Sequence, residues 1–201
     1  MNEYLCILTM TQLCIIAGPN GAGNTTASFS ILPGILGVNE FVNANEIARG
    51  LSPFNPNFVS IKAGKLMLNR IDELLSNRLD FAFETTLSSK SFTNTIRKAK
   101  TQHYFVTLVF FYLESPELAI QRVKNRILEG GHSIPESVII RRYYKGLANL
   151  FSLYLKLVDK WLIFDNSNIK LNFVGEGSSL NQQFIYNPIT WNKINSQWNK
   201  I

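Results

Sequence analysis

Apolar residues in this chain gather into short runs that alternate with stretches of helical periodicity. Residues 13–17 form an apolar run with two β-branched side chains that ends at Gly18-Pro19, and residues 104–113 are almost continuously apolar. Both runs are typical of strands that are covered on both faces. Residues 57–78 instead repeat apolar side chains at helical spacing, which predicts a long amphipathic helix. The alternation of strand and helix signals predicts a layered α/β fold.

The remaining elements follow from turn and capping signals. Ser115-Pro116 predicts a helix start, with serine as cap and proline at the first helical position. Ser133-Ile134-Pro135-Glu136 has the spacing of a capping box, so another helix is predicted from there to about residue 158. Further strands are predicted at residues 40–44, 81–85, 161–164, 169–174 and 184–186, and further helices at 90–101, from 115 to Gly130-Gly131, and from Pro188.

Nothing along the chain predicts a division into domains. We find no internal repeat and no linker, so residues 1–201 are expected to form a single domain. Residues 1–9 are interpreted as a loose extension, with Met1 and Met10 both open as the true start. Residues 115–158 are expected to supply helices that include a lid, and residues 181–201 a C-terminal tail.

Composition narrows the class of protein. The 201 residues are 46% hydrophobic and 17% charged, which supports a sizeable core and excludes wholesale disorder. Twenty basic residues against fourteen acidic ones give a net charge of +6, which suits phosphate-bearing partners as well as plain solubility. Two cysteines cannot form a disulfide scaffold. The cysteine content is that of a reduced, intracellular chain, so we expect a cytoplasmic protein. No apolar run reaches the roughly 20 residues of a spanning helix, so we expect no membrane partner.

The segment from Gly18 to Thr26 carries the clearest chemistry. It follows a predicted buried strand and precedes a predicted helix, which is the context of a phosphate-binding P-loop. Its glycines let several backbone amides point at one anion, and the helix adds its positive end. The expected nucleotide-binding residues are Gly18, Asn20, Gly21, Ala22, Gly23, Asn24, Thr25 and Thr26, with the Thr25 hydroxyl as the Mg²⁺ ligand.

One position departs from the P-loop pattern. The lysine that normally precedes the hydroxyl residue is Asn24 here. Lysine delivers a full charge to the β and γ phosphates, whereas an amide can only donate hydrogen bonds. Since a hydrogen bond to a charged group contributes roughly 1.5–3 kcal/mol, the replacement lowers the expected affinity or rate by at least one to two decades. Lys62, Lys65 or a lid arginine could compensate in part.

Four separated motifs resemble the zeta-toxin-like P-loop kinases, especially their small stand-alone bacterial members. The resemblance runs from about residue 11 to 166. It is carried by Ala17-Gly18-Pro19-Asn20-Gly21-Ala22-Gly23, by Phe41-Val42-Asn43-Ala44-Asn45-Glu46-Ile47-Ala48-Arg49-Gly50-Leu51, by Phe83-Glu84-Thr85-Thr86-Leu87-Ser88 and by Gly130-Gly131-His132-Ser133-Ile134-Pro135. It implies a three-layer P-loop fold with a mostly parallel five- or six-stranded sheet and a helical lid.

The resemblance also implies an activity and partners. It implies transfer of the γ-phosphoryl group of ATP or GTP, with Mg²⁺, to a hydroxyl of a small acceptor such as a UDP-linked amino sugar. Members act as toxins in toxin–antitoxin pairs, so an antitoxin protein is an implied partner. No specific nucleic-acid partner is expected.

By the same resemblance, Asn45 stands where the family has the aspartate that accepts the proton of the acceptor hydroxyl. An amide does not act as a base at neutral pH, and general base catalysis typically contributes about 10²–10⁴-fold. Glu46 is a tempting substitute, but neighbouring helix residues point roughly 100° apart. We interpret Glu46 as serving the first turn of its helix.

The remaining site residues lie at a strand end and on the lid. The resemblance implies that Glu84 and Thr85 bind the acceptor or organise Mg²⁺, at a strand end where ligands of open α/β sheets sit. It also implies that Arg126 and Arg142, with Arg141 less favoured, close onto the transferring phosphate. His132 is interpreted as structural.

Four functions fit these observations. The first is a kinase impaired by Asn24 and Asn45, and the second is a degenerate relative that binds a nucleotide without phosphotransfer. A transport ATPase shares the glycine-rich loop, but the chain has no L-S-G-G-Q signature. Nonspecific nucleic-acid binding through the basic surface would show steep salt dependence.

Overall fold

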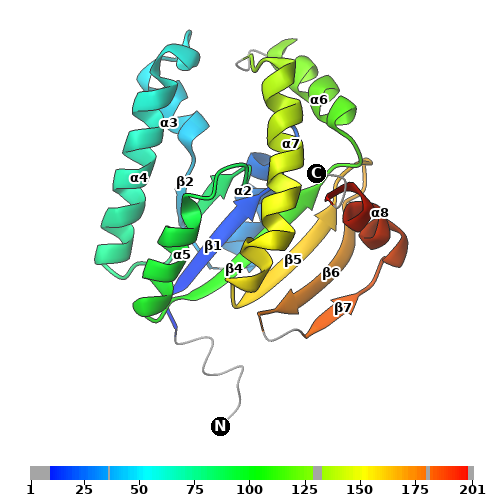
Figure 1. Cartoon of the computed structure of the whole chain (residues 1–201). Helices are drawn as coiled ribbons and strands as arrows, with labels where there is room; N and C mark the ends of the chain where they lie inside the picture. Colours follow the sequence, from blue (N-terminus) through cyan, green and yellow to red (C-terminus); the bar gives the residue numbers. More distant parts are fainter. Residues whose placement is uncertain (1–9, 36, 129–132, 180–181, 199–201) are drawn as a thin grey trace.

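The structure is a computed structural model that describes residues 10–35, 37–128, 133–179 and 182–198. Figure 1 shows its helices and strands alternating along the chain. The strands are β1 (Gln12–Ala17), β2 (Glu40–Val42), β3 (Phe81–Thr85), β4 (Phe105–Tyr112), β5 (Lys160–Asp165), β6 (Asn172–Ser178) and β7 (Gln183–Ile185). The helices are α2 (Asn24–Ile35), α3 (Ala44–Leu51), α4 (Ser60–Ser76), α5 (Phe92–Thr101), α6 (Pro116–Leu128), α7 (Glu136–Ser152) and α8 (Pro188–Trp198), with 3₁₀ turns η1 (Pro56–Val59) and η2 (Tyr154–Lys156).

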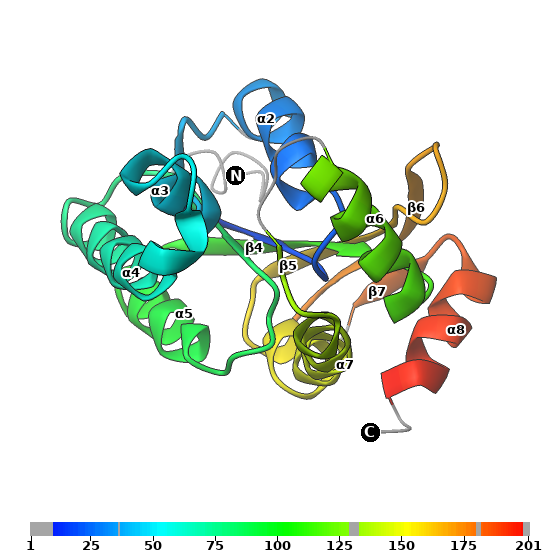
Figure 2. The same ribbon diagram turned by 90° about the horizontal axis from the view of Figure 1, so that it is seen from above.

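The strands form one sheet in the order β2-β3-β1-β4-β5-β6-β7. The first five strands in this order are parallel, and β6 and β7 continue the sheet in antiparallel fashion. Seen from above in Figure 2, α2 lies on one side of the sheet and α4, α5 and α7 lie on the other. The predicted α/β layering is therefore confirmed, with seven strands among the described residues instead of five or six.

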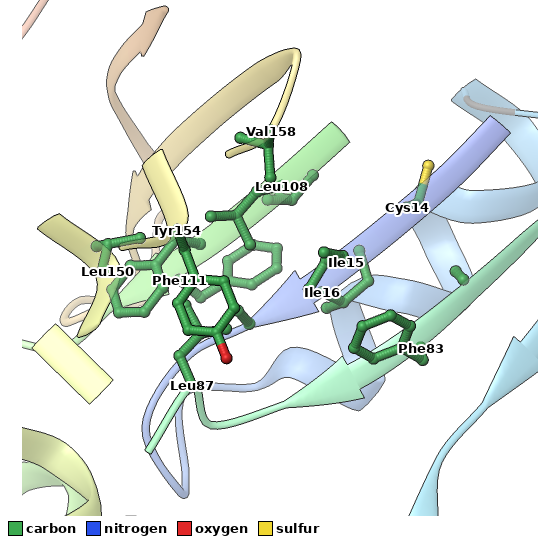
Figure 3. Packing of buried hydrophobic residues seen from close by; sticks show 14 of the residues in the cluster. Cys14, Ile15, Ile16, Phe83, Leu87, Leu108, Phe111, Leu150, Tyr154 and Val158 are labelled. Carbon is green, nitrogen blue, oxygen red and sulfur yellow. The ribbon is translucent and has the colours of Figure 1, made fainter. Parts of the chain in front are cut away.

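The central strands form the core. Ile15 and Ile16 of β1 and Phe111 of β4 are almost fully buried. Figure 3 shows them among side chains of β3, β4 and the segment that follows α7. Full burial of each such side chain contributes about 1.5–3 kcal/mol. This packing fixes the carboxyl ends of β1, β3 and β4 relative to one another.

Two predicted helices have different limits in the structure. The helix expected at 57–78 begins as a 3₁₀ turn with Pro56 at its first position and becomes α-helical only at Ser60. The helix expected to run to about 158 ends at Ser152, because Leu153 leaves the helical region with φ −127°. Tyr154 then points inward, and its hydroxyl donates to the carbonyl of Ser89 at 2.6 Å.

The capping-box prediction at Ser133 is wrong. The residue that caps α7 is Pro135, with extended backbone (ψ 137°) and no side-chain hydrogen bond. Its carbonyl instead accepts the backbone amides of Val138 and Ile139 at 2.9 and 3.1 Å. A proline at this position holds an extended conformation that places Ser133 outside the first turn.

Two predicted strands also have different limits in the structure. The strand expected at 169–174 is β6 at Asn172–Ser178, and Ile169 is fully exposed before it. Strand β2 ends at Val42, two residues early, because Asn43 caps α3. Residues 1–9 and Gly130-Gly131-His132, for which a loose extension and a lid turn were predicted, lie outside the described residues.

Within residues 10–35, 37–128, 133–179 and 182–198, no helix combines the length and the apolar character needed to cross a bilayer.

Candidate phosphate-binding active site

The glycine-rich loop lies where β1 ends and α2 begins, at the carboxyl edge of the parallel strands (Figure 1). Strand β1 pairs with β3 on one side and with β4 on the other. Strands β2 and β3 therefore lie on one side of β1 and strands β4 and β5 on the other, so the strand order reverses at β1. Such a switch in strand order opens a crevice in which ligands of α/β proteins bind. The loop backbone is tied to this edge, because the Gly18 amide donates to the Thr85 carbonyl at 3.3 Å.

Two glycines give the loop its curvature. Gly21 and Gly23 have φ of 79° and 80°, a left-handed conformation that other L-residues adopt only at a cost. A Cβ at Gly21 would also lie 3.0 Å from the carbonyl oxygen of Ala119 on α6. The Ala22 carbonyl accepts from the side chain of Asn166 at 2.8 Å, so the residue that follows the carboxyl end of β5 anchors the loop. The close approach of α6 and the hydrogen bond from Asn166 therefore fix the shape of the loop.

Asn24 turns back onto this loop. Its Nδ2 donates to the Gly18 carbonyl at 3.1 Å, and its side chain is only 6% exposed. Among the described residues its Oδ1 has no hydrogen-bond partner. The amide therefore helps to close the loop, as a donor, but brings no positive charge to the place where phosphates would lie.

Thr25, Glu84 and Asn43 form one hydrogen-bonded cluster. The Thr25 hydroxyl donates to Glu84 Oε2 at 2.7 Å, and Asn43 Nδ2 donates to the same oxygen at 2.7 Å. The Asn43 side-chain oxygen accepts the Asn45 amide at 2.8 Å and so caps α3. The end of β3, the start of α2 and the start of α3 are thereby fixed to one another. The Thr25 oxygen also accepts from Asn43 Nδ2 at 3.3 Å, which leaves it one further lone pair for a cation.

Burial raises the pKa of the Glu84 carboxyl above its ordinary value. The hydrogen bond from Thr25, the charge of Arg126 and a contact with Asn24 oppose this rise, whereas the charge of Glu46 adds to it. The carboxylate is therefore a negative group held at the loop against a desolvation cost. A cation bound beside it would relieve that cost.

Arg126 supplies positive charge to the same cavity. Burial lowers its pKa, and the attraction of Glu84 partly restores it. Burial also lowers the pKa of Arg142, with repulsion from Arg141 as a second cause. Arg141 itself is exposed. Of the residues proposed to compensate for the missing lysine, Arg126 reaches the loop, and Lys62 and Lys65 are exposed on α4 away from it.

The loop lines a cavity of about 220 Å³. This volume is below the roughly 300–1,000 Å³ of typical small-molecule pockets, so it suits a polyphosphate chain better than a whole nucleotide. Its walls combine the loop with carboxylate, amide and guanidinium groups. The lining residues are Pro19, Asn20, Gly21, Ala22, Gly23, Asn24, Thr25, Thr26, Asn45, Glu84, Arg122 and Arg126.

Asn45 also lines a second cavity, of about 150 Å³. This cavity lies between the start of α3, the η1 turn and α7, and it contains Arg142. Its other lining residues are Ala44, Ala48, Pro56, Asn57 and Ser60. Asn57 links the two walls, because its side chain donates to the Ser133 carbonyl at 3.3 Å. Asn45 thus stands between a phosphate-sized cavity and a second polar one.

Gly18, Thr85 and Glu46 are among the residues from the sequence analysis that line neither cavity. The Thr85 hydroxyl accepts the Leu87 amide at 3.1 Å, so its contacts shape the turn after β3. Glu46 is exposed and pairs with Arg49 at 3.5 Å, as expected for a residue serving the helix. Sequence reasoning missed the roles of Asn43, Asn57 and Asn166. The Asn43-to-Asn45 spacing at a strand-to-helix junction was a usable capping signal for the first of them.

The sheet order β2-β3-β1-β4-β5 and the loop after β1 define a P-loop fold of the kinase type. The family model for zeta toxins matches residues 41–173, and the chain belongs to the zeta toxin family. An uncharacterized protein of Haemophilus influenzae is 29% identical over 127 residues, which cover 63% of this chain and 88% of that protein.

Solved structures agree on the fold. A chain from the PezAT chromosomal toxin–antitoxin system of Streptococcus pneumoniae matches with a TM-score of 0.67 and 15% identity, over 96% of this chain and 80% of that one. A chain of the AvrRxo1-ORF1:AvrRxo1-ORF2 complex with sulphate ions matches with a TM-score of 0.72 and 15% identity, over 92% of this chain but only 63% of that one. A gluconokinase from Sinorhizobium meliloti matches with a TM-score of 0.52, 15% identity and coverage of 79% and 83%.

The buried carboxylate gives a pH-dependent prediction for Glu84→Gln. Because the pKa of Glu84 is raised in the folded protein, the native state binds its proton more tightly than the unfolded chain does, and stability falls as pH rises above 4.5. Glutamine does not ionise, so it removes the fall in stability that ionisation of the buried carboxyl causes. Its side-chain oxygen can still accept from both Thr25 and Asn43. We expect the variant to be more stable than wild type at neutral pH, with a gain that vanishes on acidification.

Urea unfolding at a series of pH values measures this difference. Glu117→Gln, at an exposed position on α6, is the control and should show no comparable gain. A Glu84→Gln variant that is less stable than wild type at neutral pH would contradict the proposed balance of burial and hydrogen bonding.

Proposed function

We propose that this protein is a cytoplasmic P-loop phosphotransferase, folded as one domain, that transfers the γ-phosphoryl group of ATP or GTP to a hydroxyl of a small acceptor. The observation that carries the proposal is the shared position of Asn45. Asn45 lines both the cavity of the glycine-rich loop and the cavity that contains Arg142. A nucleoside triphosphate in the first cavity and the hydroxyl of a phosphoryl acceptor in the second would meet beside this residue.

The residues of the first cavity fit a Mg²⁺-bound triphosphate. The first backbone amides of a helix lack partners within it, so those at the start of α2 can donate to an anion beside the loop. The Thr25 hydroxyl and the Glu84 carboxylate are hard oxygen ligands at one place, as Mg²⁺ prefers. The bound ion would neutralise charge on the β and γ phosphates. Arg126 would act on the same phosphates from α6.

The transfer step needs no covalent role for the protein. The acceptor oxygen forms a bond to the γ phosphorus while the bond from that phosphorus to the bridging oxygen breaks, and the nucleoside diphosphate leaves. Asn45 can hold the acceptor hydroxyl through its amide but cannot remove the proton, which goes to solvent. Asn24 adds no charge at the phosphates. We therefore propose that the rate is impaired by several decades relative to a family member with lysine and aspartate at these positions.

The second cavity supports a polar, anionic acceptor. Asn45, Asn57 and Ser60 offer amide and hydroxyl groups, and Arg142 offers a half-buried guanidinium whose pairing with an anion would offset its burial. A sugar nucleotide such as a UDP-linked amino sugar has the matching hydroxyl and phosphate groups. Membership of the zeta toxin family, and the toxin–antitoxin system to which the PezAT chain belongs, support an antitoxin protein as a partner.

The second candidate function is nucleotide binding without transfer. The hydrogen bond from the Asn24 side chain to the Gly18 carbonyl favours binding without transfer, because this internal contact keeps the loop closed where a P-loop lysine would supply a cation. A single pair of measurements separates the two functions. We expect MgATP to raise the melting temperature of the purified protein, and slow transfer of labelled phosphate from ATP to a UDP-amino sugar. Binding without transfer to any UDP-sugar would favour the second candidate, and absence of nucleotide binding would exclude both.

A further inference from the structure

We propose that the connection between α3 and α4 is a docking surface for anionic lipid membranes. Three large apolar side chains stand on it, namely Phe54, Phe58 and Ile61, which we call the apolar tip. They are 102%, 89% and 78% exposed. The tip lies at the upper end of α4 in Figure 1, the same end of the molecule as the carboxyl edge of the parallel strands.

The apolar tip differs from the other exposed apolar residues. Leu128 at the end of α6, Ile169 between β5 and β6, and Ile189 on α8 are also strongly exposed, but they lie far apart in the chain. Phe184 and Tyr186, which precede Ile189, are less exposed, at 62% and 59%. Single exposed apolar side chains are normal on proteins, whereas a group of them marks a contact surface. Between residues 54 and 61 the chain places three of them on one short turn and the start of α4.

The segment of the chain that carries the tip has charged residues of one sign only. From residue 47 to residue 71 the chain has four basic residues and no acidic one. Arg49 and Arg70 are paired with Glu46, Glu40 and Glu73. Lys62 and Lys65 form none of the ion pairs found within the described residues, and both are exposed on the first turns of α4 beside Ile61. These two lysines are complementary to an anionic surface, which attracts each nearby basic side chain.

The shape and composition of the tip favour lipid over two other partners. Side chains as exposed as Phe54 and Phe58 project from the surface, so a protein partner would need a preformed hollow to receive them. The boundary between lipid head groups and acyl chains accepts any such projection. Single-stranded nucleic acid would stack on the phenylalanines but would gain little from Ile61.

The sequence predicted no membrane partner because no segment is long and apolar enough to span a bilayer. Docking of the apolar tip needs no spanning segment, since these side chains would insert only into the surface of the bilayer. The docking does not depend on phosphotransfer. Because Pro56, Asn57 and Ser60 line the second cavity, docking would also place that cavity close to the lipid head groups.

Vesicle co-sedimentation tests the proposal. The probes are vesicles of phosphatidylcholine alone and of an equal mixture with phosphatidylglycerol. We expect the full chain to bind the mixed vesicles much more tightly than the neutral ones, with weaker binding at high salt. Phe54→Ser combined with Phe58→Ser should weaken binding at least about tenfold, since each buried phenylalanine contributes that much. Lys62→Gln combined with Lys65→Gln should weaken binding and reduce its salt dependence.

The control replaces exposed apolar side chains elsewhere, as Ile169→Ser combined with Ile189→Ser. It should bind mixed vesicles as wild type does. Failure of wild type to bind mixed vesicles overturns the proposal, as does an equal loss in the control and the Phe54/Phe58 variant. Tip-dependent binding to oligothymidylate without vesicle binding would also overturn it, in favour of nucleic acid. Circular dichroism of each variant shows that the fold is intact. None of these outcomes depends on kinase activity.

Discussion

Restoring both replaced residues, as Asn24→Lys combined with Asn45→Asp, is expected to raise the rate of phosphotransfer by at least about three orders of magnitude. A general base contributes about 10²–10⁴-fold, and a hydrogen bond to a charged group roughly 1.5–3 kcal/mol, which is one to two further decades. Lysine at position 24 would replace the internal bond to the Gly18 carbonyl with a cation at the phosphates. Aspartate at position 45 would face both cavities.

The two single variants should each recover much less than the pair. Both residues act on one transition state, so their effects are expected to be strongly non-additive. Asn77→Lys combined with Asn69→Asp is the matched control, because it introduces the same charges at exposed positions on and beside α4. A double revertant that folds and binds MgATP but stays inactive would show that the site assignment is wrong.

Gly21→Ala is expected to reduce the affinity for MgATP at least about tenfold. The alanine would have to adopt φ near 79°, which costs an L-residue roughly 1–2 kcal/mol. Its Cβ would also lie 3.0 Å from the Ala119 carbonyl oxygen and 3.1 Å from Arg122 Cβ. Either the loop moves away from α6 or the amides that form the anion cradle lose their common direction. Isothermal titration calorimetry measures the loss.

Gly64→Ala is the control for this experiment. Gly64 lies inside α4, and a Cβ there meets nothing within 4 Å. Alanine should leave nucleotide affinity unchanged and raise the free energy of unfolding by about 0.5–1 kcal/mol, because glycine is unfavourable within a helix. Equal nucleotide affinity in Gly21→Ala and wild type would mean that phosphates do not contact this loop.

The sequence predicted the elements that rest on local pattern. The strands β1, β3 and β4 were found within one residue of their limits, because continuous apolar runs bounded by turn residues leave little choice of register. The ends of α7 were mispredicted for two reasons, of which only the first is local. Pro135 displaced the cap from Ser133, and the buried Tyr154 ended the helix early through its bond to Ser89. The second reason depends on a contact between distant parts of the chain.

The candidate site was predictable to the extent that motifs mark it. The glycine spacing identified the loop, and the strand end identified Glu84, which the structure brings together with Thr25. The part played by Asn43 depends on three elements meeting, since its amide bonds Glu84 while its oxygen caps α3. The division of the site into two cavities depends likewise on how η1 and α7 approach each other. Both arrangements depend on contacts between residues far apart in the chain, which the spacing of residues in the sequence does not predict.

A crystal structure with a non-hydrolysable ATP analogue and Mg²⁺ would show whether phosphates bind the glycine-rich loop. We expect the β phosphate to lie within hydrogen-bond distance of the backbone amides of Gly21, Gly23 and Asn24, with the metal ion beside Thr25 and Glu84. An analogue bound elsewhere, or a loop that stays closed by the bond from Asn24 to Gly18 and excludes the phosphates, would contradict this expectation.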